Sequence, residues 1–324
     1  MQYEVVSFIV VNVGKRLHAG ALTGPQLARS APPYSDLLPR YREVGHELIS
    51  VSGRRVSVIT KFYEPEIVVV EARCYVDSLW NDAVLVFKRA VVQACLEIVE
   101  KRYQFDGVYE EYTVFCVSGY RSLREFDKYR GRIACLMRNE LEAMDRSVVD
   151  VALKDSSLRF SSYDWAVVGW DAAVLFVDDA QEFSEIIEVL VVANIQLLQI
   201  RLLNKELEEG LVSVKDVLST KRLVGWRLRN TLKQIIQLRT TSLFDLEHAK
   251  TNINLLGDWY TATLFSLASR KFHLDEKNAE VEKRLDALED VFEMVSSRVD
   301  SFYMLVLEFT IVVLIIFEIV LAFL

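Results

Sequence analysis

Residues 302–324 form an apolar run, FYMLVLEFTIVVLIIFEIVLAFL, in which Glu308 and Glu318 are the only charged residues. About 20 consecutive apolar residues are long enough to cross the hydrocarbon core of a bilayer as a helix. Whatever the rest of the chain folds into, lipid or protein must keep this run out of water. We therefore expect one transmembrane helix at residues 302–324 that anchors a soluble body, which argues against a freely diffusing enzyme.

The two glutamates of this run need an environment that tolerates a carboxyl group. Ionisable side chains within a membrane span are costly and usually face protein or water. One interpretation is that Glu308 and Glu318 reach the headgroup regions at the two ends of the span. The other is that they hydrogen-bond between the helices of an oligomer, or line a pore. Ten residues of separation place them about 80° apart around a helix, so one oligomer interface could hold both.

The segment before the apolar run, residues 276–302, has the pattern of a coiled-coil or bundle helix. Apolar residues recur at spacings of three and four, and charged residues fill the other face. The apolar positions are Val281, Leu285, Leu288, Phe292, Val295 and Val299. No Gly or Pro interrupts the chain from this segment into the apolar run, so one continuous helix is predicted. We predict a homo-oligomer that uses Leu285, Leu288 and Phe292 together with the two glutamates.

Composition and charge narrow the class of protein. The chain has 324 residues, of which 52% are hydrophobic, and a net charge of −8, which is unlike that of a nucleic-acid-binding protein. The four cysteines form no CxxC pair and lie in apolar runs, so reduced core thiols in a cytosol-like compartment are expected. The apolar stretch near the N-terminus follows Glu4 and precedes Lys15 and Arg16, which is the wrong charge order for a signal peptide and favours a strand.

The first part of the chain, residues 1–179, mixes strand and helix patterns and predicts an α+β domain. Stretches that start near Ile67 and Ala166 each run from an apolar strand through a polar break to an apolar helix, which suggests a two-layer domain of ferredoxin-like units. The expected strands are residues 2–13, 55–61, 66–76, 111–118, 148–154, 165–170 and 172–177. The expected helices are residues 79–103 and 123–145, and residues 19–53 read as a loop rich in Gly and Pro.

The later part of the chain is predicted to be helical throughout. Residues 180–273 are expected to form a helical bundle from three segments, 180–218, 219–250 and 251–270. Residues 274–301 would then form the coiled-coil stalk and residues 302–324 the transmembrane helix.

Catalytic signatures are missing from the sequence. There is no GxSxG, P-loop, GxGxxG, HExxH or EF-hand pattern, and His and Cys show no metal-ligand spacing. Asp178 and Asp179 follow an apolar strand, where some enzymes place metal ligands, but the first turn of the next helix is the simpler explanation. We therefore expect no catalytic residue, no cofactor and no metal, and a protein that is not an enzyme.

A basic stretch stands out in this acidic chain. No acidic residue occurs between Asp216 and Asp245, while basic residues recur there around Trp226. These residues could pair with acidic segments of a helical bundle, or they could contact anionic lipid or RNA. The candidate contact residues are Arg222, Arg227, Arg229 and Lys233.

The end of the chain resembles a known family. Residues 307–318, LEFTIVVLIIFE, are similar to the ending of the "required for meiotic nuclear division" proteins, which typically continue Leu-Glu with Trp where this chain has Phe309. Residues 283–294 and 257–274 also resemble that family. The resemblance implies a prokaryotic member in the inner membrane, a homo-oligomer and a link to translation through ribosomes or RNA, and it carries over no catalytic residue.

We therefore expect a single-pass protein anchored at its C-terminal end, with the soluble part on the cytosolic side. Its role would be that of a self-associating scaffold or tether at the bilayer. The alternative is an oligomeric transport or channel component that contributes one membrane helix per subunit, in which the glutamates of the span would meet ions.

Overall fold

A computed structural model describes residues 1–14, 22–23, 41–159, 161–178, 182–219, 233, 235–236 and 259–323 of the chain. The chain divides into two compact units. The first consists of Met1–Gln199 and Ala249–Asp275, and the second of Ile200–His248 and Glu276–Leu324. The boundary falls within two long helices, so each of these helices contributes to both units.

The first unit is built on one mixed sheet, which has nine strands in the described residues. The strands are β1 (Gln2–Asn12), β2 (Leu22–Thr23), β3 (Tyr41–Val51), β4 (Arg54–Tyr63), β5 (Ile67–Val76), β6 (Tyr109–Ser118), β7 (Ser157–Leu158), β8 (Trp165–Val168) and β9 (Ala172–Phe176). Their spatial order is β2-β3-β4-β5-β1-β6-β9-β8-β7. Neighbours are antiparallel except β6 and β9, which are parallel.

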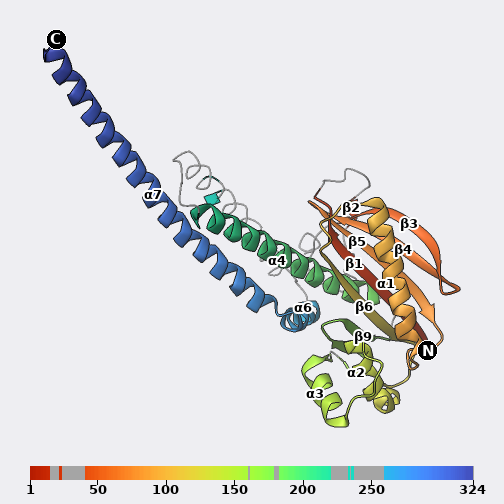
Figure 1. Ribbon diagram of the computed structural model, residues 1–324. Helices are drawn as coiled ribbons and strands as arrows, with labels where there is room; N and C mark the ends of the chain where they lie inside the picture. The colour runs from red at the N-terminus through yellow and green to blue at the C-terminus, as the bar shows by residue number, and fades with distance from the viewer. Residues whose placement is uncertain are drawn as a thin grey trace. The chain divides into compact units, whose positions relative to one another are not determined.

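The helices follow in chain order between and after the strands. They are α1 (Ala83–Arg102), the 3-10 helix η1 (Leu123–Tyr129), α2 (Arg130–Arg138), α3 (Arg146–Ser156), α4 (Glu182–Ser219), α6 (Trp259–Lys271) and α7 (Leu274–Phe323). Figure 1 shows α1 lying along one face of the sheet.

Strand β1 lies in the middle of the sheet and is buried from Glu4 to Val11. Such a continuous run of buried residues is typical of a strand that is covered on both faces. On one face, Ile9 and Val11 belong to the apolar cluster that includes Val91 and Cys95 of α1. The residues next to Ile9 and Val11 along β1 point to the opposite face of the sheet. Phe8 is one of these, and its ring centroid lies 5.8 Å from that of Tyr112.

The opposite face is covered by helix α4. Residues 186–198 of this helix are all buried. They include Asn194 and Gln196, although Asn and Gln are usually exposed in folded proteins. A helix that is apolar on every side is typical of a protein core. The ring of Phe272, just after α6, packs edge-on against Tyr112 at 5.5 Å on the same face. The first unit therefore has helices on both sides of its sheet.

A buried ionic cluster joins α4 to this face. The ammonium of Lys61 on β4 donates to Glu71 of β5 at 2.9 Å and to Glu188 of α4 at 3.1 Å. Arg73 donates to the second oxygen of Glu71 at 2.6 Å, and the hydroxyl of Tyr63 donates to Glu188. The side chains of Lys61, Glu71 and Glu188 are 8%, 0% and 4% exposed. Two cations and two carboxylates thus balance within the interior, as buried charges require.

The cluster changes the titration of its members. Burial by itself would raise the pKa of Glu71, but the nearby charges of Lys61 and Arg73 outweigh burial and lower that pKa to about 2. Burial would lower the pKa of Lys61, and Glu71 and Glu188 instead raise it above the ordinary value. At neutral pH, Glu71 therefore stays ionised and Lys61 stays protonated. The stabilisation from Glu71 is present above pH 4.5 and is lost as the pH falls toward 2.

Several expectations from the sequence are confirmed. The α+β class holds for the first unit, and the apolar N-terminal stretch is β1 rather than a signal peptide-like helix. The expected strands at residues 55–61 and 66–76 are β4 and β5, which pair as an antiparallel hairpin with Glu64 and Pro65 at the turn. The expected helices at residues 79–103 and 180–218 are α1 and α4, although α1 begins later, at Ala83.

Other expectations are wrong. Residues 148–154 belong to helix α3, not to a strand, because the side chain of Asp145 accepts from Ser147 N at 2.9 Å and caps the helix. Residues 41–51 form strand β3 instead of a loop. The helix expected over 123–145 ends at Arg138, where Asn139 adopts a left-handed φ of 56°.

Ferredoxin-like units are not confirmed. Strands β5 and β6 both run antiparallel to β1 and lie on either side of it, so β5, α1 and β6 form one split β-α-β arrangement. The second expected unit does not repeat this arrangement, because β8 and β9 are adjacent antiparallel strands. The element order also differs from the β-α-β-β-α-β order of a ferredoxin-like domain.

The turn between β8 and β9 requires a glycine. A Cβ on Gly169 would lie 2.3 Å from Met137 Cγ and 2.7 Å from the carbonyl oxygen of Met137. We predict that Gly169→Ala lowers the free energy of unfolding by about 1–3 kcal/mol, as overpacking does. Gly131→Ala is the matched control: its Cβ would meet nothing within 4 Å, and the position is helical, so a gain of about 0.5–1 kcal/mol is expected. Urea unfolding of the full chain in detergent measures both.

The ionic cluster yields a second prediction. Lys61→Met leaves two buried carboxylates with one cation, and should lower the free energy of unfolding by about 3–5 kcal/mol. The double variant Lys61→Met/Glu188→Leu removes one charge of each sign, so its cost should be smaller than the sum of the two single costs by about 0.5–3 kcal/mol. Lys101→Met is the control, because its pair with Glu97 is exposed, and it should cost no more than about 0.5 kcal/mol. Additive costs in the double variant would contradict the coupling.

Candidate functional site

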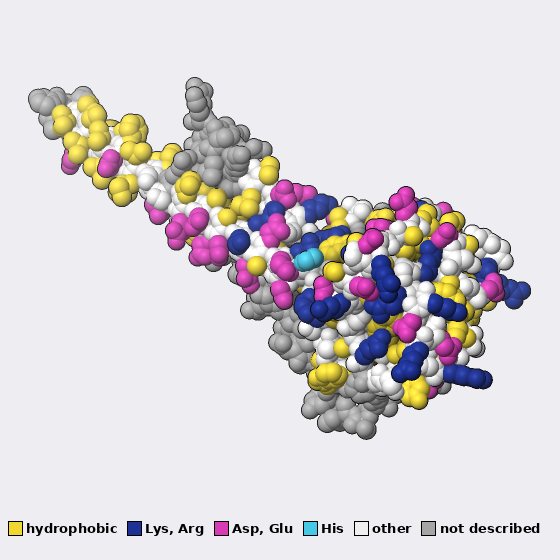
Figure 2. Space-filling view, turned by 90° about the horizontal axis from the view of Figure 1, so that it is seen from below, with side chains coloured by type: hydrophobic (Ala, Val, Ile, Leu, Met, Phe, Trp, Pro, Cys, Tyr) yellow, Lys and Arg dark blue, Asp and Glu magenta, His cyan; other side chains and the backbone are white. Residues whose placement is uncertain are grey.

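Helix α7 carries the largest exposed apolar surface among the described residues. From Phe302 to Val320 its large apolar side chains are between 36% and 71% exposed. Figure 2 shows hydrophobic side chains over the last part of this helix, and acidic side chains gathered on the segment before it. Contiguous exposed apolar surface of this extent marks a site for a membrane or a partner protein.

Two helices in the described part of the chain are long and apolar enough to cross a membrane. The first candidate, Glu182–Val212, lies within α4, and 83% of its most apolar window is buried. That burial identifies a core helix, which meets the same criterion of length and composition. The second candidate, Leu274–Val320, has a mean hydropathy of 2.5 in its most apolar window, and none of that window is buried. The two candidates therefore differ in burial: protein covers the first, and the second is exposed.

The polar groups of the exposed segment are few. The hydroxyl of Thr310 donates to the carbonyl oxygen of Val306 at 2.7 Å, so it is satisfied within the helix. Glu308 and Glu318 are both exposed, as expected for groups that project from a lone helix. The structure thus places both predicted site residues on the apolar part of α7.

The predicted stalk residues have a different environment. Leu285 and Leu288 are 5% and 0% exposed, and Phe292 is half-buried. Arg284 bridges to Glu208 of α4 at 3.2 Å, which places this part of α7 beside the C-terminal half of α4 within the second unit. One chain by itself therefore covers the apolar stripe of residues 281–299. Self-association through Leu285, Leu288 and Phe292 stays a prediction.

The predicted basic contact residues fall largely outside the described residues. Arg222, Arg227 and Arg229 lie there, whereas Lys233 is described and is exposed in a helical segment. Contact of this stretch with lipid, RNA or an acidic partner stays a prediction.

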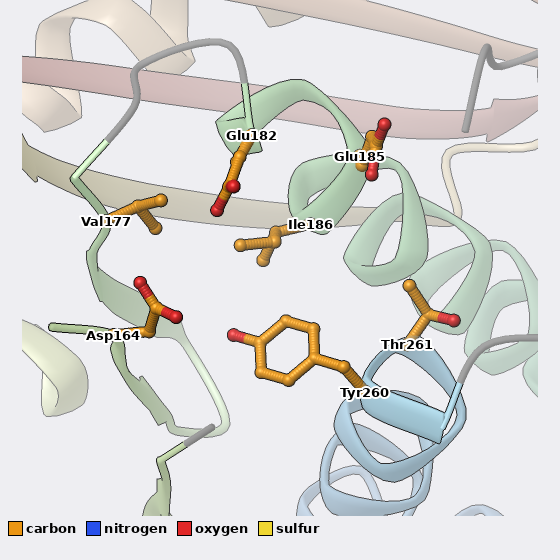
Figure 3. Close-up of a pocket in the computed structure, with 7 residues that line it drawn as sticks. All are labelled: Asp164, Val177, Glu182, Glu185, Ile186, Tyr260 and Thr261. Atoms are coloured by element: carbon orange, nitrogen blue, oxygen red, sulfur yellow. The ribbon is translucent and has the colours of Figure 1, made fainter. Parts of the chain in front are cut away.

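A small cavity in the first unit lies beside the first turns of α4 and α6. Its lining residues are Asp164, Val177, Glu182, Glu185, Ile186, Tyr260 and Thr261. Figure 3 shows the carboxylates of Asp164 and Glu182 and the hydroxyl of Tyr260 pointing toward the space between them. The volume is about 20 Å³, which is room for about one water molecule. A drug-sized substrate would need a far larger space.

Tyr120 adjoins this acidic region, and its hydroxyl donates to the carbonyl oxygen of Tyr163. Burial, followed by the nearby carboxylates Asp164 and Asp178, raises the pKa of Tyr120. The phenol of Tyr120 therefore stays protonated at neutral pH, as an unshifted phenol also does. Within the described residues, no group of His, Cys, Asp or Glu could hold a metal ion, while Asp179 lies outside them.

Neither the cavity nor the ionic cluster was predicted from the sequence. Lys61 and Glu188 are separated by 127 positions, and Tyr260 and Asp164 lie on segments that the chain order does not bring together. One local signal was present: Glu188 is the only charged residue among residues 186–198 of α4. A lone acid in a core helix requires a buried cation, but the sequence does not say which one.

Comparison with known proteins places the chain in a family. Residues 5–183 match the family described as "Uncharacterized protein MJ0711, N-terminal domain", and this match covers more than half of the chain. The uncharacterized protein MJ0711 of Methanocaldococcus jannaschii is 27% identical over 292 residues, which are 89% of this chain and 87% of that protein. No solved structure matches the chain.

The resemblance of residues 257–324 to the "required for meiotic nuclear division" family finds no support in these comparisons. The matched region coincides with the sheet of the first unit, from β1 to the start of α4. The similarity to MJ0711 extends over most of both chains. The chain belongs to the family defined by the N-terminal domain of MJ0711.

Proposed function

We propose that this protein is a membrane-anchored scaffold or tether, in which the exposed apolar segment of α7 crosses the bilayer and holds the α+β unit at the membrane. The observation that carries the proposal is the exposure of every large apolar side chain from Phe302 to Val320. Leaving so much apolar surface in water costs roughly 25 cal/mol for each Å². A bilayer removes that cost without any further partner.

The dimensions of the segment fit this role. From Phe302 to Val320 the helix rises about 27 Å at 1.5 Å per residue, close to the hydrocarbon thickness of about 30 Å. Glu308 lies about 9 Å along the axis from Phe302, and Glu318 about 24 Å. The stretch between them contains no charged residue. Glu318 lies near one end of the segment, whereas Glu308 lies only about 5 Å from its midpoint, where an unpartnered charge is most costly.

The first unit is a tightly packed body, which suits a domain that an anchor holds at the membrane. Its described cavity has room for about one water, and its buried ionic cluster is internally paired. The four cysteines are free thiols, and all four are buried. Reduced thiols are typical of the cytosolic side of a membrane, which is where we place this unit.

The anchor can be tested by placing charges at the centre of the segment. Val313→Asp/Ile316→Asp should release the chain from membranes, because each aspartate at the middle of a span costs about 2.5–3.5 kcal/mol. Both positions are exposed, so the fold of the two units should not change. The measurement is the fraction of chain that stays in the membrane pellet after carbonate extraction at high pH.

The matched control is Val313→Leu/Ile316→Leu, which keeps the segment apolar and should remain in the pellet. Far-UV circular dichroism verifies that both variants are folded. A parent chain that carbonate extracts as readily as the aspartate variant would disprove membrane anchoring by this segment.

A further inference from the structure

The two faces of α7 differ in what covers them. At about 100° per residue, the buried positions Val281, Leu285, Leu288, Val295 and Val299 lie within about 40° of one line along the helix. Glu308 follows Val299 by nine residues, which places it about 180° from that line. Glu318 lies about 100° from it by the same reckoning. Both glutamates therefore project on the side away from the buried stripe.

The glutamates lie in a regular seam on that side. Residues Ser301, Met304, Glu308, Ile311, Ile315 and Glu318 follow one another at spacings of 3, 4, 3, 4 and 3, and all six are exposed. We call this set the glutamate seam. Alternation of three and four is the spacing that brings two helices together along their length. The seam extends over about 26 Å of helix, which is long enough for a stable crossing.

We propose that the glutamate seam is the docking surface for a second copy of this chain, packed parallel in the same membrane. Copies that enter the bilayer in the same direction hold equal residues at equal depth. Glu308 then meets Glu308, and Glu318 meets Glu318. The carboxyl groups of each pair then face one another across the interface, within reach of a hydrogen bond between the helices.

The environment of the seam favours a second copy over lipid. Lipid tails offer no hydrogen-bond partner to a carboxyl group, whereas a helix with the same group at the same depth does. Ile311 and Ile315 lie between the two carboxyl positions and supply apolar contact. The buried stripe of residues 281–299 faces the other way, so docking leaves the packing against α4 unchanged. The two faces of α7 thus serve one chain and its neighbour.

This inference rests on the proposed membrane anchor, and the experiment separates the two. The purified full chain is reconstituted into phosphatidylcholine vesicles with a single added cysteine, Ile315→Cys on the seam or Val313→Cys on the opposite side. The two sites have similar depth and similar exposure, 50% and 46%. The four natural cysteines are buried and give a low background. A mild oxidant then reports which positions meet between copies.

The expected result is a disulfide-linked dimer from Ile315→Cys and little or none from Val313→Cys. Adding Glu308→Leu/Glu318→Leu to Ile315→Cys removes both carboxyl pairs and should weaken the dimer by about tenfold. This estimate takes each pair to contribute roughly threefold, as an average hydrogen bond between membrane helices does. Glu308→Gln/Glu318→Gln should retain most of the cross-linking, because amides also pair across helices.

Each other outcome has a distinct meaning. Equal cross-linking at both positions, or none at either in chains that stay with the vesicles, would overturn the seam while leaving the anchor intact. Leucine variants that cross-link as well as the parent would overturn the role of the carboxyl pairs. A chain that does not stay with the vesicles would refute the anchor itself.

Discussion

The contact between helix α4 and the sheet is the interaction on which the rest of the first unit depends. Residues 186–198 of α4 are apolar on nearly every side, and they are buried together with one face of the sheet. Charge neutrality adds a second requirement, because Glu188 must meet Lys61 and Tyr63 when the helix docks. A one-residue slip of α4 would remove these partners, so the cluster also fixes the position of the helix.

The same physical criterion separates α7 from α4. Both helices are long and apolar, but protein covers α4, whereas the segment from Phe302 to Val320 is bare. The stripe of residues 281–299 resembles α4 in this respect, because the second unit covers it. Helix α7 therefore changes from a protein-covered helix to an exposed one along its length, and the proposed function follows from that change.

Much of this was predictable from the sequence where local pattern decides the structure. The apolar residues of β1 and the uninterrupted run of α7 gave both elements with nearly correct bounds. Local pattern misled at α3, where Val148, Val149 and Val151 favour a strand, while the cap at Asp145 and burial of one face favour the helix that forms. Long-range pairs such as Lys61 and Glu188 were beyond reach, because tertiary folding alone brings them together.

The central claim is that the end of α7 lies in lipid. Fluorescent labels placed one at a time along residues 297–317 of the full chain in vesicles report it most directly, through quenchers attached at known depths of the acyl chains. We expect labels near residue 297 to respond to an aqueous quencher, and labels at residues 309–313 to respond most strongly to quenchers near the bilayer centre. Aqueous quenching that stays uniform along the whole series would contradict it.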